Sequence, residues 1–113
     1  MEDQKLTILW TSGERDVALK VVLRYIETEL EAKHWPSIEL IIWGPSVRLA
    51  MDDDAIREKL ISLQEHGLLT KACIVCAEEY EVTERLQGAN IAVDFVCEDL
   101  THIIQSQHPF VSF

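Results

Sequence analysis

Apolar positions along the chain fall into short continuous runs, which predict buried strands, and longer runs with helical spacing. The short runs, rich in Val, Ile, Leu and Trp, lie at 5–10, 37–43, 70–75 and 91–96, with a short closing run at 110–113. The helical runs lie at 14–33, from the aspartates at 52–54 to Gly67, between the third and fourth strands up to Gly88, and at 98–106. The helix before Gly88 is expected to break near residues 81–82.

Two helix starts carry polar residues that suit caps. Thr11 followed by Glu14 matches a capping box, in which each side chain accepts a hydrogen bond from the backbone amide of the other. The run Asp52, Asp53 and Asp54 places carboxylates where they satisfy free amides and face the positive end of the next helix. We assign this run to capping.

Strands that alternate with helices predict a mainly parallel sheet covered on both sides. The expected fold is therefore an α/β domain spanning residues 1–113, a three-layer α/β/α sandwich with about five strands, flavodoxin-like in outline. Ligands of such sheets bind beyond the carboxyl ends of the strands. This edge is expected to hold three turns, at residues 11–13, 44–46 and 73–77.

Charge excludes some partners. The chain has 10 Lys and Arg against 20 Asp and Glu, a formal charge of -10, which repels nucleic acid and anionic membranes. The first five residues are acidic and contain no apolar segment, unlike a signal or transit peptide, and no apolar stretch reaches the roughly 20 residues that span a bilayer. We expect a cytoplasmic protein without nucleic-acid or membrane partners.

Cysteine placement gives the main chemical signal. Three cysteines in a reducing compartment favour free thiols, a metal or redox chemistry over a disulfide framework. Cys73 and Cys76 lie where the third strand gives way to a helix, a place where thiols become reactive, whereas Glu78 and Glu79 would raise a nearby thiol pKa. A zinc site would need two more ligands, and the histidines lack ligand spacing, so no metal is predicted. Cys97 is expected to pack in the core. Trp10, Trp35 and Trp43 are expected to be core or interface residues, and Trp10 and Trp43 lie at strand ends where they could wall the cysteine site.

Four segments together resemble the DsrE/DsrF family of small cytoplasmic α/β proteins, several of which act in sulfur relay. They are LTILW at 6–10, IIWGPSV at 41–47, KACIVCA at 71–77 and GANIAV at 88–93, and the resemblance extends over nearly the whole chain. In that family the sulfur-carrying cysteine ends the third strand, nine residues before a Val that follows a Gly. Counting back from Val82 reaches Cys73, although Glu81 stands where relatives have the Gly.

The resemblance implies a sulfurtransferase component that carries sulfur as a persulfide on Cys73 and exchanges it with a donor or acceptor protein. It marks Cys76 as an additional cysteine of some relatives, implies a homo-oligomer, a trimer or hexamer, and calls for no cofactor. Two alternatives stay open from the residues themselves. One is a dithiol redox protein that uses Cys73 and Cys76, and the other is a non-catalytic ligand-binding or structural homo-oligomer.

Overall fold

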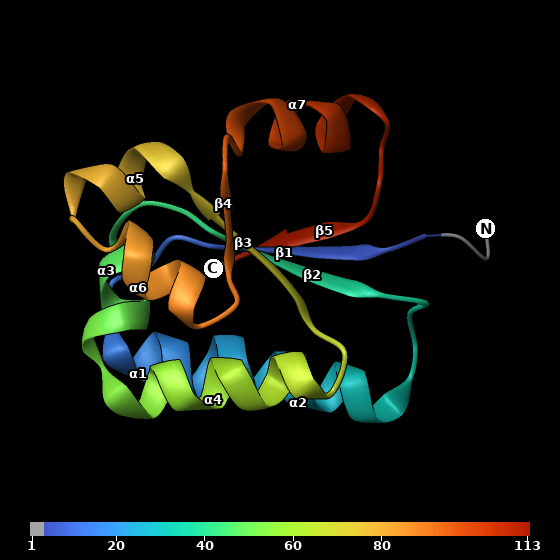
Figure 1. Ribbon diagram of the computed structural model, residues 1–113. Coiled ribbons are helices and arrows are strands. Elements are labelled where there is room, and N and C mark those ends of the chain that lie inside the picture. The colour runs from blue at the N-terminus through green and yellow to red at the C-terminus, as the bar shows by residue number, and fades with distance from the viewer. Residues whose placement is uncertain (1–3) are drawn as a thin grey trace.

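A computed structural model describes residues 4–113, which form an α/β fold around a five-stranded parallel sheet (Figure 1). The strands, in chain order, are β1 (Leu6–Trp10), β2 (Ile38–Ile42), β3 (Leu69–Cys73), β4 (Ala92–Asp94) and β5 (Phe110–Ser112). Their order across the sheet is β4-β3-β2-β1-β5, and every neighbouring pair is parallel. The predicted parallel sheet is confirmed, with strands one to three residues shorter than the apolar runs.

Helices occupy the segments between the strands. They are α1 (Arg15–Val17), the π-helical turn η1 (Ala18–Val22), α2 (Leu23–Ala32), α3 (Pro45–Asp52), α4 (Asp54–Glu65), α5 (Ile74–Glu79), α6 (Thr83–Gly88) and α7 (Cys97–Gln105). The helix expected over 14–33 is present as the continuous run of α1, η1 and α2. The break expected near residues 81–82 separates α5 from α6.

The direction of the crossovers decides which face each helix covers. From β1 to β4 the chain steps across the sheet in one direction, and right-handed crossovers place α1, α2 and α4, which lie between β1 and β3, on one face (Figure 1). It returns past β1 to form β5, so α7 lies on the other face. Figure 1 shows α1, α2 and α4 below the sheet and α7 above it. The three-layer prediction holds, with α7 as the third layer.

Central strands supply most of the core. Ile8 of β1 and Leu40 of β2 stand opposite each other and are fully buried, as is Ala72 of β3. Side chains alternate along a strand, so Lys71 points to the opposite face, where its ammonium binds the Asp99 carboxylate of α7. This ion pair attaches α7 to the sheet at β3.

The capping box expected at Thr11 and Glu14 is wrong. Thr11 Oγ1 instead donates to the Phe113 carbonyl at 3.3 Å, and the Glu14 amide donates to Ser12 Oγ at 3.1 Å. Pairing of β5 continues past the end of β1, where the Thr11 amide donates to the same carbonyl at 2.8 Å. Thr11 is therefore hydrogen-bonded to the end of the β5 segment and does not cap the helix.

The apolar segment 47–51, between the second strand and the aspartate run, belongs to helix α3, with Pro45 at its start. Within residues 4–113, no helix combines the length and apolar character that crossing a membrane demands.

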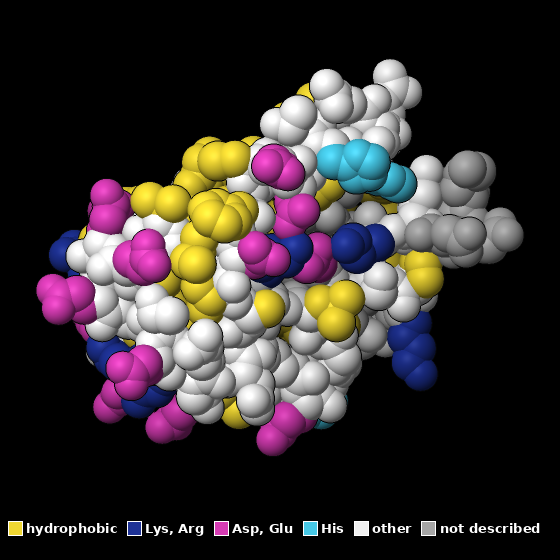
Figure 2. All heavy atoms as spheres, turned by 45° about the horizontal axis from the view of Figure 1, so that its top comes forward, with side chains coloured by type: hydrophobic (Ala, Val, Ile, Leu, Met, Phe, Trp, Pro, Cys, Tyr) yellow, Lys and Arg dark blue, Asp and Glu magenta, His cyan; other side chains and the backbone are white. Residues whose placement is uncertain are grey.

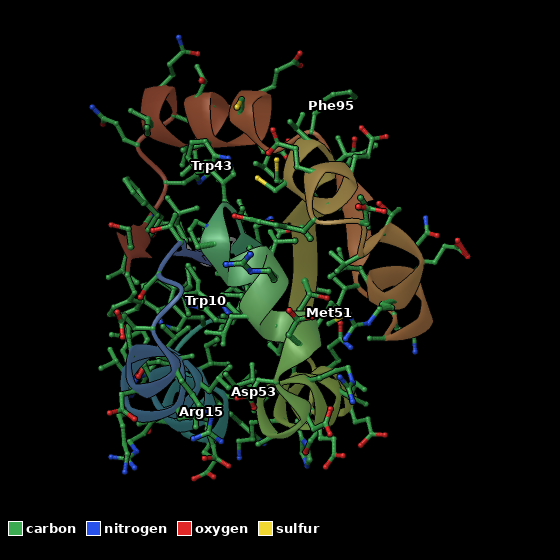
Figure 3. All side chains as sticks on the ribbon, turned by 90° about the vertical axis from the view of Figure 1, so that its left-hand side faces the viewer. Trp10, Arg15, Trp43, Met51, Asp53 and Phe95 are labelled. Atoms are coloured by element: carbon green, nitrogen blue, oxygen red, sulfur yellow. The ribbon has the colours of Figure 1, made fainter. Side chains whose placement is uncertain are left out.

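Asp53 caps α4, as the aspartate run predicted. Its Oδ1 accepts from the Ile56 amide at 3.0 Å, and its Oδ2 accepts from Arg15 Nε of α1 at 2.5 Å. The Arg15 hydrogen bond, with help from the Ile56 amide, holds the pKa of the Asp53 carboxyl below its usual range. This one side chain joins the starts of two helices on the same face of the sheet (Figure 3).

We expect Asp53→Ala to lower the free energy of unfolding at pH 7 by about 1 kcal/mol, the usual cost of losing an N-cap. Because the folded-state pKa is depressed, the difference from wild type should persist above pH ~4 and shrink as the carboxyl protonates below it. Urea unfolding at several pH values measures this. Asp54→Ala removes an ion pair with Arg57 and a charge in the first turn of α4, but leaves the cap hydrogen bond to the Ile56 amide in place. It is the control and should cost less than Asp53→Ala. Equal losses would contradict the cap assignment.

Candidate functional site

The two cysteines of the sequence motif lie together at the carboxyl edge of the sheet. Cys73 is the last residue of β3 and the N-cap of α5, and Cys76 lies in the first turn of that helix. Both are free thiols, with exposed fractions of 4% for Cys73 and 9% for Cys76. Near the labelled Trp43 and Phe95, Figure 3 shows two sulfur atoms next to each other.

A backbone amide reaches the second thiol. Gly44 N–H, in the turn after β2, donates to Cys76 Sγ at 3.3 Å. Burial raises the pKa of Cys76, and the neighbouring Cys73 thiol and the Glu79 carboxylate raise it further, while the Gly44 amide opposes them. Cys76 is therefore a neutral thiol at neutral pH, held in place by one hydrogen bond.

The Gly44 turn depends on its backbone geometry. Gly44 has φ 74° and ψ -143°, a conformation that side chains with a Cβ avoid. The buried Ser46 hydroxyl donates to the Trp10 carbonyl at 2.5 Å and accepts from the Trp43 amide at 3.2 Å, so it joins the ends of β1 and β2. A Cβ on Gly13 would lie 2.9 Å from Pro45 Cβ. These close contacts fix the direction of the Gly44 amide.

Cationic groups do not offset the raised pKa of Cys76. Lys71 is the basic residue nearest in sequence, and its ammonium is bound by Asp99, whose hydrogen bond is the main cause of its raised pKa. The expectation that nearby carboxylates oppose thiol activation is confirmed for Glu79, which adds to the rise at Cys76. Glu79 is the last residue of α5 rather than part of its first turn, and Glu78 does not contribute.

Two expectations about neighbouring residues are wrong. Cys97 is exposed at the first position of α7 rather than packed in the core, because α7 turns Asp99, Leu100 and Ile103 toward the protein. Trp10 is fully buried, which confirms it as a core residue, and it does not wall the cysteine site, since alternation along β1 directs it away from the α7 face. Trp43 does lie at the site edge, partly buried.

Metal binding has no support in the described part of the chain, where no cluster of three or more His, Cys, Asp or Glu side chains could hold an ion. Two hollows lie away from the cysteines. One, of about 500 Å³, lies at the amino ends of β3 and β4 and includes Glu39, Leu69 and Lys71 in its walls, and the other, of about 310 Å³, lies between α2 and α4. Sequence reasoning had singled out neither.

Glu81, the position where the resembled family has glycine, adopts the glycine-like conformation. Its φ is 57°, in the left-handed region. The Val82 amide donates to the Ala77 carbonyl at 2.9 Å, which closes the end of α5 in the manner of a Schellman motif, and Val82 is 3% exposed. A Gly-Val pair suits the end of α5 because the first position has left-handed backbone angles and the second side chain is buried.

No family model matches the chain, and no curated protein matches it. Two solved structures are similar to it. BT1422 from Bacteroides thetaiotaomicron, a conserved protein of unknown function, has a TM-score of 0.93 and 26% identity over 97% of this chain and 95% of its own. MTH1491 from Methanobacterium thermoautotrophicum, also of unknown function, has a TM-score of 0.81 and 10% identity over 98% and 100%. The parallel five-stranded fold is shared, and neither protein has an established activity to compare.

We expect alkylation of Cys76 by iodoacetamide to show a pH midpoint above that of a small thiol measured in parallel. Thiolate is the reacting form, so a raised pKa shifts the whole rate profile to higher pH. Mass spectrometry of the peptides follows each cysteine separately. Repeating the series in denaturant should bring the midpoint down to that of the small thiol. A midpoint at or below the small thiol in the folded protein would contradict the burial argument.

Glu81→Gly should stabilise the protein by up to about 1 kcal/mol, because glycine removes left-handed strain and gives back part of the gain as unfolded-chain entropy. Urea unfolding measures the change. Glu78→Gly, in the exposed part of helix α5, is the matched control and should destabilise by roughly 0.5–1 kcal/mol. Destabilisation by both substitutions would count against the assigned conformation of Glu81.

Proposed function

We propose that this protein carries sulfane sulfur as a persulfide on Cys73, as a component of a sulfur-relay or sulfurtransferase system. The observation that carries the proposal is the place of Cys73 at the carboxyl end of a central parallel strand, with a second thiol beside it. That edge is where ligands of such sheets bind. The DsrE/DsrF-like sequence pattern marks the same residue.

The reaction needs only a donor. The Cys73 thiolate attacks the outer sulfur of a persulfide donor, R–S–SH, and takes that sulfur with its hydrogen as Cys73–S–SH, while the donor leaves as a thiolate that takes a proton from solvent. No electrons enter or leave the system, because one sulfur–sulfur bond breaks as another forms. Low exposure of Cys73 keeps the product away from water and oxidants.

Apolar side chains near Cys73 support a protein partner. Val75 follows Cys73 in α5 and is 51% exposed, and Phe95 is 63% exposed, one residue beyond Asp94, which pairs with Cys73 across the sheet. Figure 2 shows a band of hydrophobic side chains on the face that carries α7. Exposed apolar groups beside a buried thiol favour docking by a sulfur donor or acceptor protein.

Two single-thiol chains test the proposal. Cys97→Ser removes the exposed thiol from both, after which Cys76→Ser leaves Cys73 alone and Cys73→Ser leaves Cys76 alone. We expect the Cys73 chain to gain one sulfur atom from inorganic polysulfide, and the Cys76 chain to gain about one tenth as much or less, because the raised pKa of Cys76 keeps its sulfur protonated and the Gly44 amide holds that sulfur in place. Intact-mass spectrometry after rapid desalting measures the gain.

Absence of a sulfur adduct on the Cys73 chain would overturn the proposal. Equal loading of both chains would do so too, because it would show unspecific thiol chemistry. The same chains in denaturant should load alike, which shows that the difference belongs to the fold.

A further inference from the structure

We propose that Cys76 resolves the Cys73 persulfide, releasing the carried sulfur as hydrosulfide and closing a Cys73–Cys76 disulfide. This inference rests on the proposed function, because it concerns the fate of the sulfur once Cys73 has accepted it. It adds a product, hydrosulfide, and a second protein state that the carrier function alone does not require.

The two thiols are placed for this attack. Cys73 is the N-cap of α5 and Cys76 lies three residues later, so the two side chains leave the same side of one helical turn. The Cβ atoms of such residues are about 5–6 Å apart, against about 3.5–4.5 Å across a disulfide. Cys73 has extended backbone angles, φ -65° and ψ 123°, so a small rotation at the cap, outside the helix, closes the gap.

A hydrogen bond from a backbone amide holds the Cys76 sulfur in place for its attack on the Cys73 persulfide. Gly44 N–H donates to Cys76 Sγ at 3.3 Å, and an N–H donor favours the anionic form of sulfur. The Gly44 turn is held by Ser46 and Pro45, so the donor does not depend on α5 itself. The Gly44 amide therefore holds the Cys76 sulfur in one position and is placed to stabilise its thiolate.

The chemistry balances without an outside oxidant. Cys76 loses its proton and its sulfur attacks the inner sulfur of Cys73–S–SH, which breaks the bond to the outer sulfur. The outer sulfur leaves with the bonding electron pair as hydrosulfide and keeps its own hydrogen. The sulfane sulfur is reduced and the two cysteine sulfurs are oxidised, so the sum is Cys73–S–SH plus Cys76–SH giving the disulfide plus hydrogen sulfide.

A reaction of a defined class must follow. The disulfide form has no thiol left at the site and accepts no further sulfur, so each turnover needs a dithiol reductant to restore both cysteines. The release of sulfur and the resetting of the site are separate steps, and the exposed Val75 and Phe95 lie where such a reductant would approach.

The test compares two chains that both carry Cys97→Ser, one with Cys73 and Cys76 and one with Cys76→Ser as well. Both are treated with one equivalent of inorganic polysulfide and desalted. In the two-thiol chain, the sulfur adduct should disappear at least about tenfold faster, since the attack is intramolecular. One equivalent of hydrosulfide should appear, and the Cys73-to-Cys76 peptide should become disulfide-bonded. The chain with Cys76→Ser should keep its adduct and release none.

The outcomes separate the two proposals. If the Cys76→Ser chain gains no sulfur, the carrier function itself fails. If it gains sulfur but the two-thiol chain keeps its adduct equally long, the carrier function stands and the resolving role of Cys76 is overturned. Cys76→Ala repeats the comparison without a hydroxyl, and circular dichroism confirms that each chain is folded.

Discussion

Right-handed crossover between parallel strands is the constraint on which the rest of this structure depends. The steps from β1 to β2 and from β2 to β3 run in one direction and bring α1, α2 and α4 onto one face, and the single reverse step leaves α7 to cover the other (Figure 1). The ends of β1, β2 and β3 then meet at one edge, where the turns after them pack on each other. Cys73, Cys76 and the Gly44 amide come from two of these turns and meet only because the strands are parallel and adjacent.

Packing and reactivity oppose each other at the cysteines. The contacts that hold the Gly44 amide in place also exclude water, and burial is the main reason that the pKa of Cys76 is raised. Such a thiol is a poor first nucleophile in neutral solution. It is better suited to a reaction in which the electrophile is generated next to it, where proximity replaces a high thiolate concentration. Burial thus makes Cys76 a poor nucleophile toward reagents in solution, but it is compatible with attack by Cys76 on a persulfide already formed on Cys73.

Local patterns predicted the elements well because each depends on neighbours in sequence: apolar runs gave the five strands, and Asp53 capped its helix as expected. What failed depended on contacts between distant residues. Thr11 hydrogen-bonds to the Phe113 carbonyl instead of capping its helix, and Cys97 is exposed because α7 turns other residues toward the core. Position 73 at the end of the third strand could be read from the chain, whereas the Gly44 donor to Cys76 could not, since it joins residues 32 positions apart. The order of the strands across the sheet could not be predicted from the sequence either, because helical connections of similar length fit several orders.

Pairing of β1 with β5 has a consequence for how the protein reaches its fold. The Phe113 amide donates to the Leu9 carbonyl at 2.8 Å, so the first strand gains one of its two neighbours from residues about a hundred positions later. Closing so long a loop is entropically costly and slows folding. During synthesis, one edge of β1 must remain open until the last strand leaves the ribosome. The emergence of β5, rather than formation of the central strands, thus sets the moment at which this unpaired strand edge is protected from other chains.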